Sequence, residues 1–261
     1  MEGQKYGRTA LVAFVSSVIT LILVVIHETV RYCTGSPIMA IDWAANALMV
    51  ATSFYIRSHV DVEEYRLAVL GSVPGGRSLN PLRFINGMPA AMTIGFGAAI
   101  TILYNFIAGM ILYFIMQILL IYTFSGIVPL DLRDFNIGES RGYYRTVILI
   151  AFLVPVAIFC EVIYNGLQSL VVVPYMLVLS AMAVMTYAAL AVAGRPLLFR
   201  VAPAAAASFF IASDILVGYV AFNNPLDKYY AAISMTYIIA MVLFNITILF
   251  LKNRNGGYIL S

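Results

Sequence analysis

Five ionisable side chains lie inside apolar stretches of this sequence, where a charged group costs at least about 2.5 kcal/mol. Asp214 is the deepest, because it follows Val201, the first residue of its apolar run, by thirteen residues. The other four lie nearer the ends of such runs: His27, Glu28, Asp42 and Glu161. Acids and histidines inside hydrocarbon mark proton relays and substrate sites, so all five are candidates for function.

Each candidate also has a structural interpretation. His27 and Arg31 share one helix face through i, i+4 spacing, so with the intervening acid they predict a charge cluster at a helix end. Asp42 is either functional or close to the headgroups, and Glu161 is either functional or reaches toward the interface. Asp214 is interpreted as functional rather than as a structural hydrogen-bond partner. Because the five groups lie at similar depths in the bilayer, they predict a polar cavity that opens toward one leaflet.

The composition identifies the elements that must position these groups. Of 261 residues, 62% are hydrophobic and 10% are charged, whereas a soluble domain carries about 25% charged residues. Apolar runs of about 20 residues have the length of membrane-spanning helices and lack the alternation of barrel strands. We therefore predict an all-α polytopic membrane protein, a single domain over residues 1–261 with about eight spans: 9–30, 37–56, 88–104, 106–128, 146–164, 169–192, 201–222 and 229–251.

Two details of this division are predicted separately. The stretch from Met88 to Val128 is too long for one crossing, and Asn105 breaks its apolar character, so we expect a tight hairpin there. The loop 57–87 carries an acidic pair and then a Pro/Gly-rich turn, which predicts a short surface helix followed by an irregular segment. The N-terminus has no small-residue cleavage site, so the first helix is expected to be retained.

The basic residues predict the orientation. Cytoplasmic loops are enriched in lysine and arginine, and with eight spans thirteen of the fifteen basic residues fall on one side: Lys5, Arg8, Arg57, Arg66, Arg77, Arg83, Arg133, Arg141, Arg145, Arg195, Arg200, Lys252 and Arg254. Arg31 and Lys228 fall on the other side. Both termini are therefore predicted to be cytoplasmic, with the polar cavity in the outer half of the bilayer. The net charge of +3 is an orientation signal and gives no reason to expect nucleic acid.

Several membrane chemistries are excluded by the residues present. The chain has only two histidines, His27 and His59, too few for haem-binding pairs or a zinc hydrolase. No lysine lies inside a predicted span, which excludes a retinal Schiff base. No P-loop, dinucleotide fingerprint or Gly-x-Ser-Gly motif occurs. We expect no metal and no cofactor.

Three apolar segments resemble the YhhN, or lysoplasmalogenase, family. Phe210, Ser213 and Asp214 match its Phe-x-x-Ser-Asp motif, and a Tyr- and Ala-rich segment follows it here as in the family. Tyr175 and Met182 match its Pro-Val-x-x-Tyr…Met helix. Phe106, Gly109 and Tyr122 match a third, Phe-x-x-Gly helix. The resemblance covers about Met88 to Leu251, and eight spans agree with the family.

The resemblance implies hydrolysis of the vinyl ether bond of a lysoplasmalogen, giving an aldehyde and a glycerophospho-headgroup. Protonation at carbon requires a carboxylic acid, and desolvation in the bilayer favours the protonated form of such a group. Asp214 would be this acid. The substrate would contact Tyr175, Ser213, Phe210, Tyr230 and Tyr237.

One departure from the family affects this mechanism. The family carries a second acid in a Gly-Asp pair on its third helix, where this chain has Ala98 and Ala99, and the helix before Gln117 lacks the family's histidine. Glu161 or Asp42 could supply the second acid. The alternative is a non-catalytic lipid-binding or transport protein of the same fold. Either function implies a membrane lipid or lysolipid as the partner, in the plasma membrane or its equivalent.

Overall fold

Every regular element in the described part of the chain is helical. The computed structural model describes residues 3–71, 79–128, 141–192, 194–223 and 229–251. The α-helices are α1 (Gly3–Thr34), α2 (Met39–His59), α3 (Val62–Gly71), α4 (Leu82–Tyr104), α5 (Phe106–Ser125), α6 (Arg141–Ile158), α7 (Val173–Ala188), α8 (Leu197–Asn223) and α9 (Tyr230–Ile246). A π-helical turn, Phe159–Ile163, continues α6, and 3₁₀ turns at Leu167–Val172, Ala189–Ala191 and Thr247–Phe250 flank α7 and extend α9.

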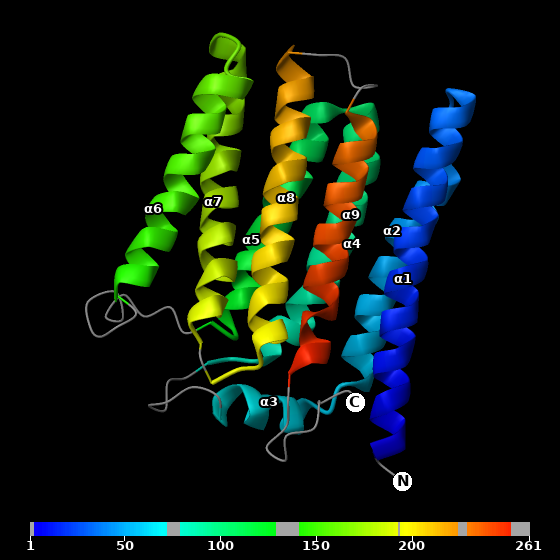
Figure 1. Ribbon diagram of the computed structural model, residues 1–261, viewed down its shortest axis with the longest axis vertical. Helices are drawn as coiled ribbons and strands as arrows, with labels where there is room; N and C mark the ends of the chain where they lie inside the picture. Colours follow the sequence, from blue (N-terminus) through cyan, green and yellow to red (C-terminus); the bar gives the residue numbers. More distant parts are fainter. Residues whose placement is uncertain (1–2, 72–78, 129–140, 193, 224–228, 252–261) are drawn as a thin grey trace.

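The long helices stand side by side in one bundle (Figure 1), which confirms the predicted all-α polytopic class. Seven helices in the described residues are long and apolar enough to cross a membrane, and they match seven of the eight predicted spans. The remaining prediction, residues 146–164, falls on α6 and its π turn, which pack beside α7. The first residues of α1 and the last of α9 lie at one end of the bundle, here called the terminal end (Figure 1). Which end faces the cytoplasm stays a prediction.

The predicted break at Asn105 is confirmed. Asn105 is extended (φ −150°, ψ 105°), and its side-chain oxygen accepts a hydrogen bond of 3.0 Å from the Ala108 N–H, so it caps the start of α5. Gly109 lies where a Cβ would be 2.5 Å from the Ile102 Cα. The missing side chain therefore allows the two helices to approach closely immediately beyond the turn.

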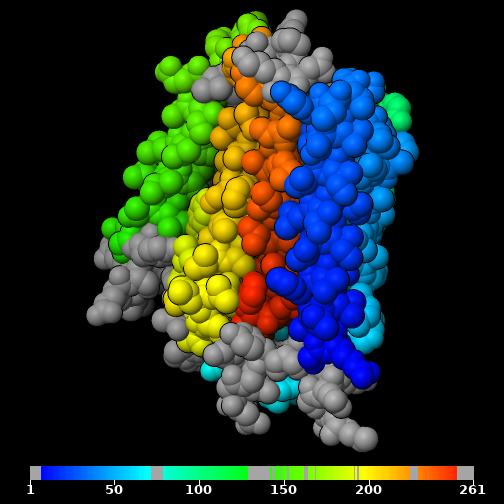
Figure 2. Space-filling model, turned by 45° about the vertical axis from the view of Figure 1, so that its right-hand side comes forward, coloured from blue at the N-terminus to red at the C-terminus, as the bar shows by residue number. Residues whose placement is uncertain are grey.

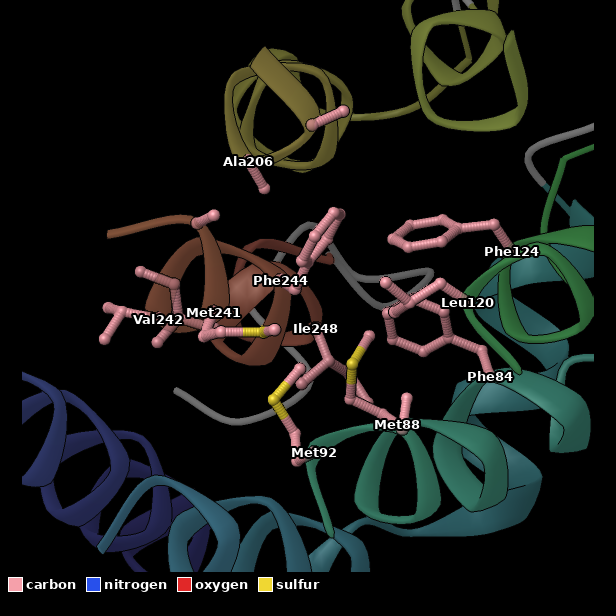
Figure 3. Close-up of a cluster of buried hydrophobic side chains, with 14 of the residues drawn as sticks. Phe84, Met88, Met92, Leu120, Phe124, Ala206, Met241, Val242, Phe244 and Ile248 are labelled. Carbon is pink, nitrogen blue, oxygen red and sulfur yellow. The ribbon is translucent and has the colours of Figure 1, made fainter. Parts of the chain in front are cut away.

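A dense apolar core fills the terminal end of the bundle (Figure 3). Phe84 of α4 and Phe124 of α5 meet edge to face with ring centroids 5.4 Å apart, and Phe124 lies 5.6 Å from Phe244 of α9. Met88 and Met92 fill the remaining space beside them. Such packing holds these helices in fixed positions, so the opposite ends of the same helices are held in place as well.

Helix α3 lies across the terminal end (Figure 1), and it confirms the predicted surface helix within the loop 57–87. It is held by Tyr65, which is fully buried and stacks on Phe84 with centroids 6.5 Å apart. Burial raises the pKa of the Tyr65 hydroxyl, so the group stays neutral. The Pro/Gly-rich part of this loop lies outside the described residues.

Helix α1 covers one outer face of the bundle, next to α9 (Figure 2). Its outward side chains are large and apolar, with Leu11 61% and Phe14 57% exposed. An exposed apolar surface of this kind suits acyl chains rather than water.

Gly109→Ala is expected to lower the midpoint of thermal unfolding in detergent, because the new methyl group would overlap the backbone of Ile102. Overpacking of this kind costs about 1–3 kcal/mol. The matched control is Gly97→Ala in α4, where a Cβ meets nothing within 4 Å; it should unfold at the wild-type temperature or above. Equal effects of the two substitutions would show that the close approach at Gly109 contributes nothing to stability.

The predicted orientation has a direct test, because Cys33 at the end of α1 is exposed and lies at the end opposite the terminal end. With Cys160 replaced by serine, a membrane-impermeant maleimide should label Cys33 in intact cells. In a cysteine-free background, Ser58→Cys near the end of α2 should react only after permeabilisation. The reverse labelling pattern would invert the predicted topology.

Candidate functional site

A cavity of about 140 Å³ lies between the helices at the end away from the termini. Its wall is made by one face of each helix, since the lining residues follow helical spacing. On α8 they are Ile211, Ser213, Asp214, Ile215, Val217 and Gly218, and on α9 they are Tyr230, Ile233, Ser234 and Tyr237. The cavity therefore lies beyond the Phe84, Phe124 and Phe244 cluster, toward the ends of the helices away from the termini.

Asp214 faces this cavity and is held by two neutral donors. The Tyr175 hydroxyl of α7 donates a hydrogen bond of 2.7 Å to Asp214 Oδ2, and Gln117 Nε2 of α5 donates one of 3.3 Å to the same oxygen. The carboxyl group thus joins α5, α7 and α8. Both donors occupy Oδ2, and within the described residues Oδ1 has no hydrogen bond.

Asp42 lies in the wall of the same cavity. It is in the first turn of α2, where a carboxylate interacts favourably with the helix dipole. One turn later, Asn46 Nδ2 donates a hydrogen bond of 3.0 Å to the Asp42 carbonyl oxygen, and its side chain also lines the cavity. Asp42 and Asp214 are thus brought to one site from segments far apart in the sequence.

The site of the family's second acid also faces this space. Ala99 of α4 lines the cavity, and its neighbour Ala98 is fully buried. An acid at position 99 would therefore enter the same cavity as Asp214. In this chain that part of the wall is a methyl group, and Asp42 is the second carboxyl in the lining.

Aromatic rings form the wall beside Asp214. Tyr113 of α5 and Tyr237 of α9 meet edge to face with centroids 5.7 Å apart, and both line the cavity. Phe210 packs behind them, 6.3 Å from each ring, and is fully buried. Phe210, predicted to contact substrate, is instead placed behind the wall, where it supports the two tyrosines.

Ser213 lines the cavity and also makes a structural contact that the motif does not reveal. Its hydroxyl donates a hydrogen bond of 3.2 Å to the Ile233 carbonyl oxygen, so it ties α8 to α9. Its neighbour in the motif is Asp214, so this bond joins α8 to α9 directly beside the acid.

The predicted charge cluster at the end of α1 is present beside the cavity. His27 Nδ1 lies 3.3 Å from Glu28 Oε1, and Arg31 lies 3.8 Å from the other oxygen of Glu28. The Arg31 guanidinium stacks over the Tyr230 ring at 3.9 Å. Tyr230 in turn lines the cavity near Asp42, so the cluster supports one part of its wall.

Glu161 lies apart from these groups. It is on the π turn after α6, is exposed, and is not among the residues that line the cavity. Of the two acids considered as the second carboxyl, only Asp42 is placed with Asp214.

Three residues of the site, Gln117, Tyr113 and Asn46, were not predicted from the sequence. Gln117 and Asn46 are buried amides inside predicted spans, and a buried amide in hydrocarbon needs a partner, which is the signal that could have identified them. Tyr113 gives no such signal, because tyrosines are abundant in this chain. Within the described part of the chain, no three His, Cys, Asp or Glu side chains are grouped to hold a metal ion.

The fold and the site define a polytopic α-helical membrane protein with an acid-lined cavity between its helices. Residues 88–248 match the YhhN family. The match covers more than half of the chain, and this protein belongs to the YhhN family. Helices α1 and α2, which carry the charge cluster and Asp42, lie outside the matched segment. Comparisons with curated proteins and with solved structures gave no match.

Ser213→Ala is expected to lower the thermal midpoint in detergent by removing the bond to Ile233, which is worth about 1 kcal/mol. Ser234→Ala is the matched control, since Ser234 lines the cavity but makes no hydrogen bond in the described part of the chain. If both variants unfold at the wild-type temperature, the α8–α9 bond does not stabilise the site.

Proposed function

We propose that this protein hydrolyses the vinyl ether bond of lysoplasmalogens by acid catalysis, with Asp214 as the proton donor. The observation that carries the proposal is the arrangement of donors on Asp214. Two hydrogen bonds from Tyr175 and Gln117 converge on Oδ2, and a neutral acid can accept both through its carbonyl oxygen while its hydroxyl oxygen carries the proton. The proton then belongs on Oδ1.

Membrane burial supports the neutral form. The lining around Asp214 is mostly apolar, and both of its hydrogen-bond partners are neutral side chains. An unpaired carboxylate in such a setting is unfavourable because it loses its hydration. A neutral carboxylic acid can donate a proton to a substrate where an ionised one cannot.

The proposed reaction has three steps. The Asp214 proton is transferred to the outer vinyl carbon, and the carbon bonded to the ether oxygen becomes an oxocarbenium ion. Water adds to that carbon and returns a proton to the Asp214 carboxylate. The resulting hemiacetal breaks its bond to the glycerol oxygen, which takes the hydroxyl proton, leaving an aldehyde and a glycerophospho-headgroup.

Asp42 supplies the second carboxyl in this proposal. A carboxylate beside the cavity stabilises the oxocarbenium ion electrostatically and orients the incoming water. The family's acid on α4 is replaced by Ala99, which lies in the same wall, so Asp42 takes over this role from a different helix. Glu161 has no part in it, because it does not line the cavity.

Asp214→Asn should abolish aldehyde release from lysoplasmalogen by the purified protein, because the amide keeps the shape but cannot donate an acidic proton. General acid catalysis contributes about 10²- to 10⁴-fold, so the loss should be at least 100-fold. Glu161→Gln is the matched control and should retain activity. Full activity of Asp214→Asn would eliminate the proposed mechanism.

A second function is favoured by Ala99, because a methyl group replaces the acid on α4. On that interpretation the protein binds or carries a lysolipid without cleaving it. The wild type would then release no aldehyde, whereas Ala99→Asp should gain the activity. If instead the wild type is active and Asp42→Asn reduces kcat at least 10-fold, Asp42 has replaced the acid on α4 and the non-catalytic function is eliminated.

A further inference from the structure

The cavity has two chemically different ends. Toward α2 and α9 it is polar, and the side chains there are Asp42, Asn46, Tyr230, Ser234 and Tyr237. Toward α5, α6 and α7 most of its lining is apolar: Phe106, Met110, Pro155, Ile158, Val172 and Met176. Tyr113 of α5 and Tyr175 of α7 also line the cavity, and the Tyr175 hydroxyl is bonded to Asp214. We propose that this apolar end is a subsite for the hydrocarbon tail of a single-chain lipid whose headgroup lies at the polar end. The inference rests on the proposed function, because it concerns the same cavity.

The apolar end is separate from the main core of the protein. Phe159 and Val172 form the buried centre of a small second cluster, and the side chains packed against it are Met110, Ile158, Met176 and Phe222. Methionine side chains are flexible and polarisable, so they adapt to a chain that has no fixed shape. Two of the six residues in this cluster are methionines, which suits a site for an alkyl chain better than a fixed apolar contact.

Helix α6 forms the outer wall of this subsite. It lies at the edge of the bundle beside α7 (Figure 1), and its π turn also contacts α8. Pro155 inside α6 removes one backbone hydrogen bond, and a π turn follows at the end of the helix, Phe159–Ile163. These two irregularities weaken the helix on the side of the subsite that faces the bilayer, away from the dense core at the terminal end.

Asp214 lies where the two ends of the cavity meet. On α7, Tyr175 donates to Asp214, and the next residue, Met176, belongs to the apolar end. A single-chain lipid bound in this direction places the first bonds of its tail at the acid. In a lysoplasmalogen these first bonds are the vinyl ether, so the two-ended cavity selects the bond that is cleaved.

One apolar end accepts one tail. The opposite part of the lining carries the carboxyl group of Asp42, the amide of Asn46 and several hydroxyl groups. A second hydrocarbon chain bound there would remove water from these polar groups without offering them a hydrogen-bond partner, which is unfavourable. The inferred ligand is accordingly a lysolipid and not a diacyl lipid.

Tryptophan fluorescence tests the orientation without requiring catalysis. Trp43 is the only tryptophan in the chain and follows Asp42 of the polar end in the sequence, without lining the cavity itself. The variant Trp43→Phe/Met176→Trp moves the reporter to the apolar end, and Trp43→Phe/Leu177→Trp is the matched control, because Leu177 is 52% exposed on the outer surface. The probe is an alkyl-ether lysophosphatidylcholine with bromine near the end of its tail, which the proposed reaction does not cleave.

The expected result is saturable quenching of the reporter at position 176 at low mole fractions of probe. Quenching at position 177 should rise only in proportion to the total probe, and native Trp43 should be quenched at least threefold less than position 176. Non-saturable quenching at 176, or stronger quenching at Trp43, would overturn the proposed direction of binding. If Met176→Trp does not fold, Trp43→Phe/Ile158→Trp places the reporter on the α6 side of the same subsite and should give the same saturable quenching.

The two proposals fail in different ways. Saturable quenching at position 176 without aldehyde release from lysoplasmalogen supports the tail subsite and rejects the hydrolase. Aldehyde release by the wild type without saturable quenching at position 176 or 158 rejects the tail subsite and leaves the hydrolase intact. A brominated two-chain phosphatidylcholine that saturates the same reporter equally well would reject the restriction to a single tail.

Discussion

A carboxyl group buried between apolar helices must find hydrogen-bond donors, and the rest of this site depends on that constraint. Asp214 meets it through Tyr175 of α7 and Gln117 of α5. Those two contacts join three helices beside the cavity. The polar bond network and the cavity thus meet at one buried group.

The bundle divides into a packed half and a hollow half. Aromatic and methionine side chains fill the terminal end (Figure 3), and α3 covers that end through Tyr65. Toward the other end, the small residues of α8 and the alanines of α4 leave space unfilled, and Asp42 and Asp214 face it. Rigid packing at one end allows the helices to remain in position around an unfilled volume at the other.

Much of this architecture could be predicted from the sequence, because a helix must be apolar over its full length to cross hydrocarbon. Asn105 and Gly109 marked the α4–α5 turn through one polar and one small residue in a long apolar run. Asp214 was identifiable because an acid there has few structural explanations. The hydrogen-bond partners of Asp214 were harder to predict: Tyr175 was found through the family motif, and Gln117 was missed although a buried amide is conspicuous.

Which side chains share the cavity depends on contacts between helices that are far apart in the sequence, and these contacts could not be predicted. Asp42 and Glu161 had the same sequence signals, and only the rotation of α2 and of the π turn separates a cavity residue from an exposed one. Phe210 and Ser213 belong to the same motif as Asp214, yet one packs behind the wall and the other bonds to the backbone of α9. Helical rotation depends on the summed packing of all neighbours, so a single segment does not reveal it.

The position of Asp214 in the chain has a consequence for how the protein is made. Its helix, α8, is synthesised before α9, which supplies the tyrosine and serine side chains on one side of the cavity. While the nascent chain ends at α8, the acid has its bonds to α5 and α7 but no wall toward α9. The cavity wall is therefore complete only after α9 has been inserted, and a ribosome that stalls within α9 leaves a chain with an open, lipid-accessible acid.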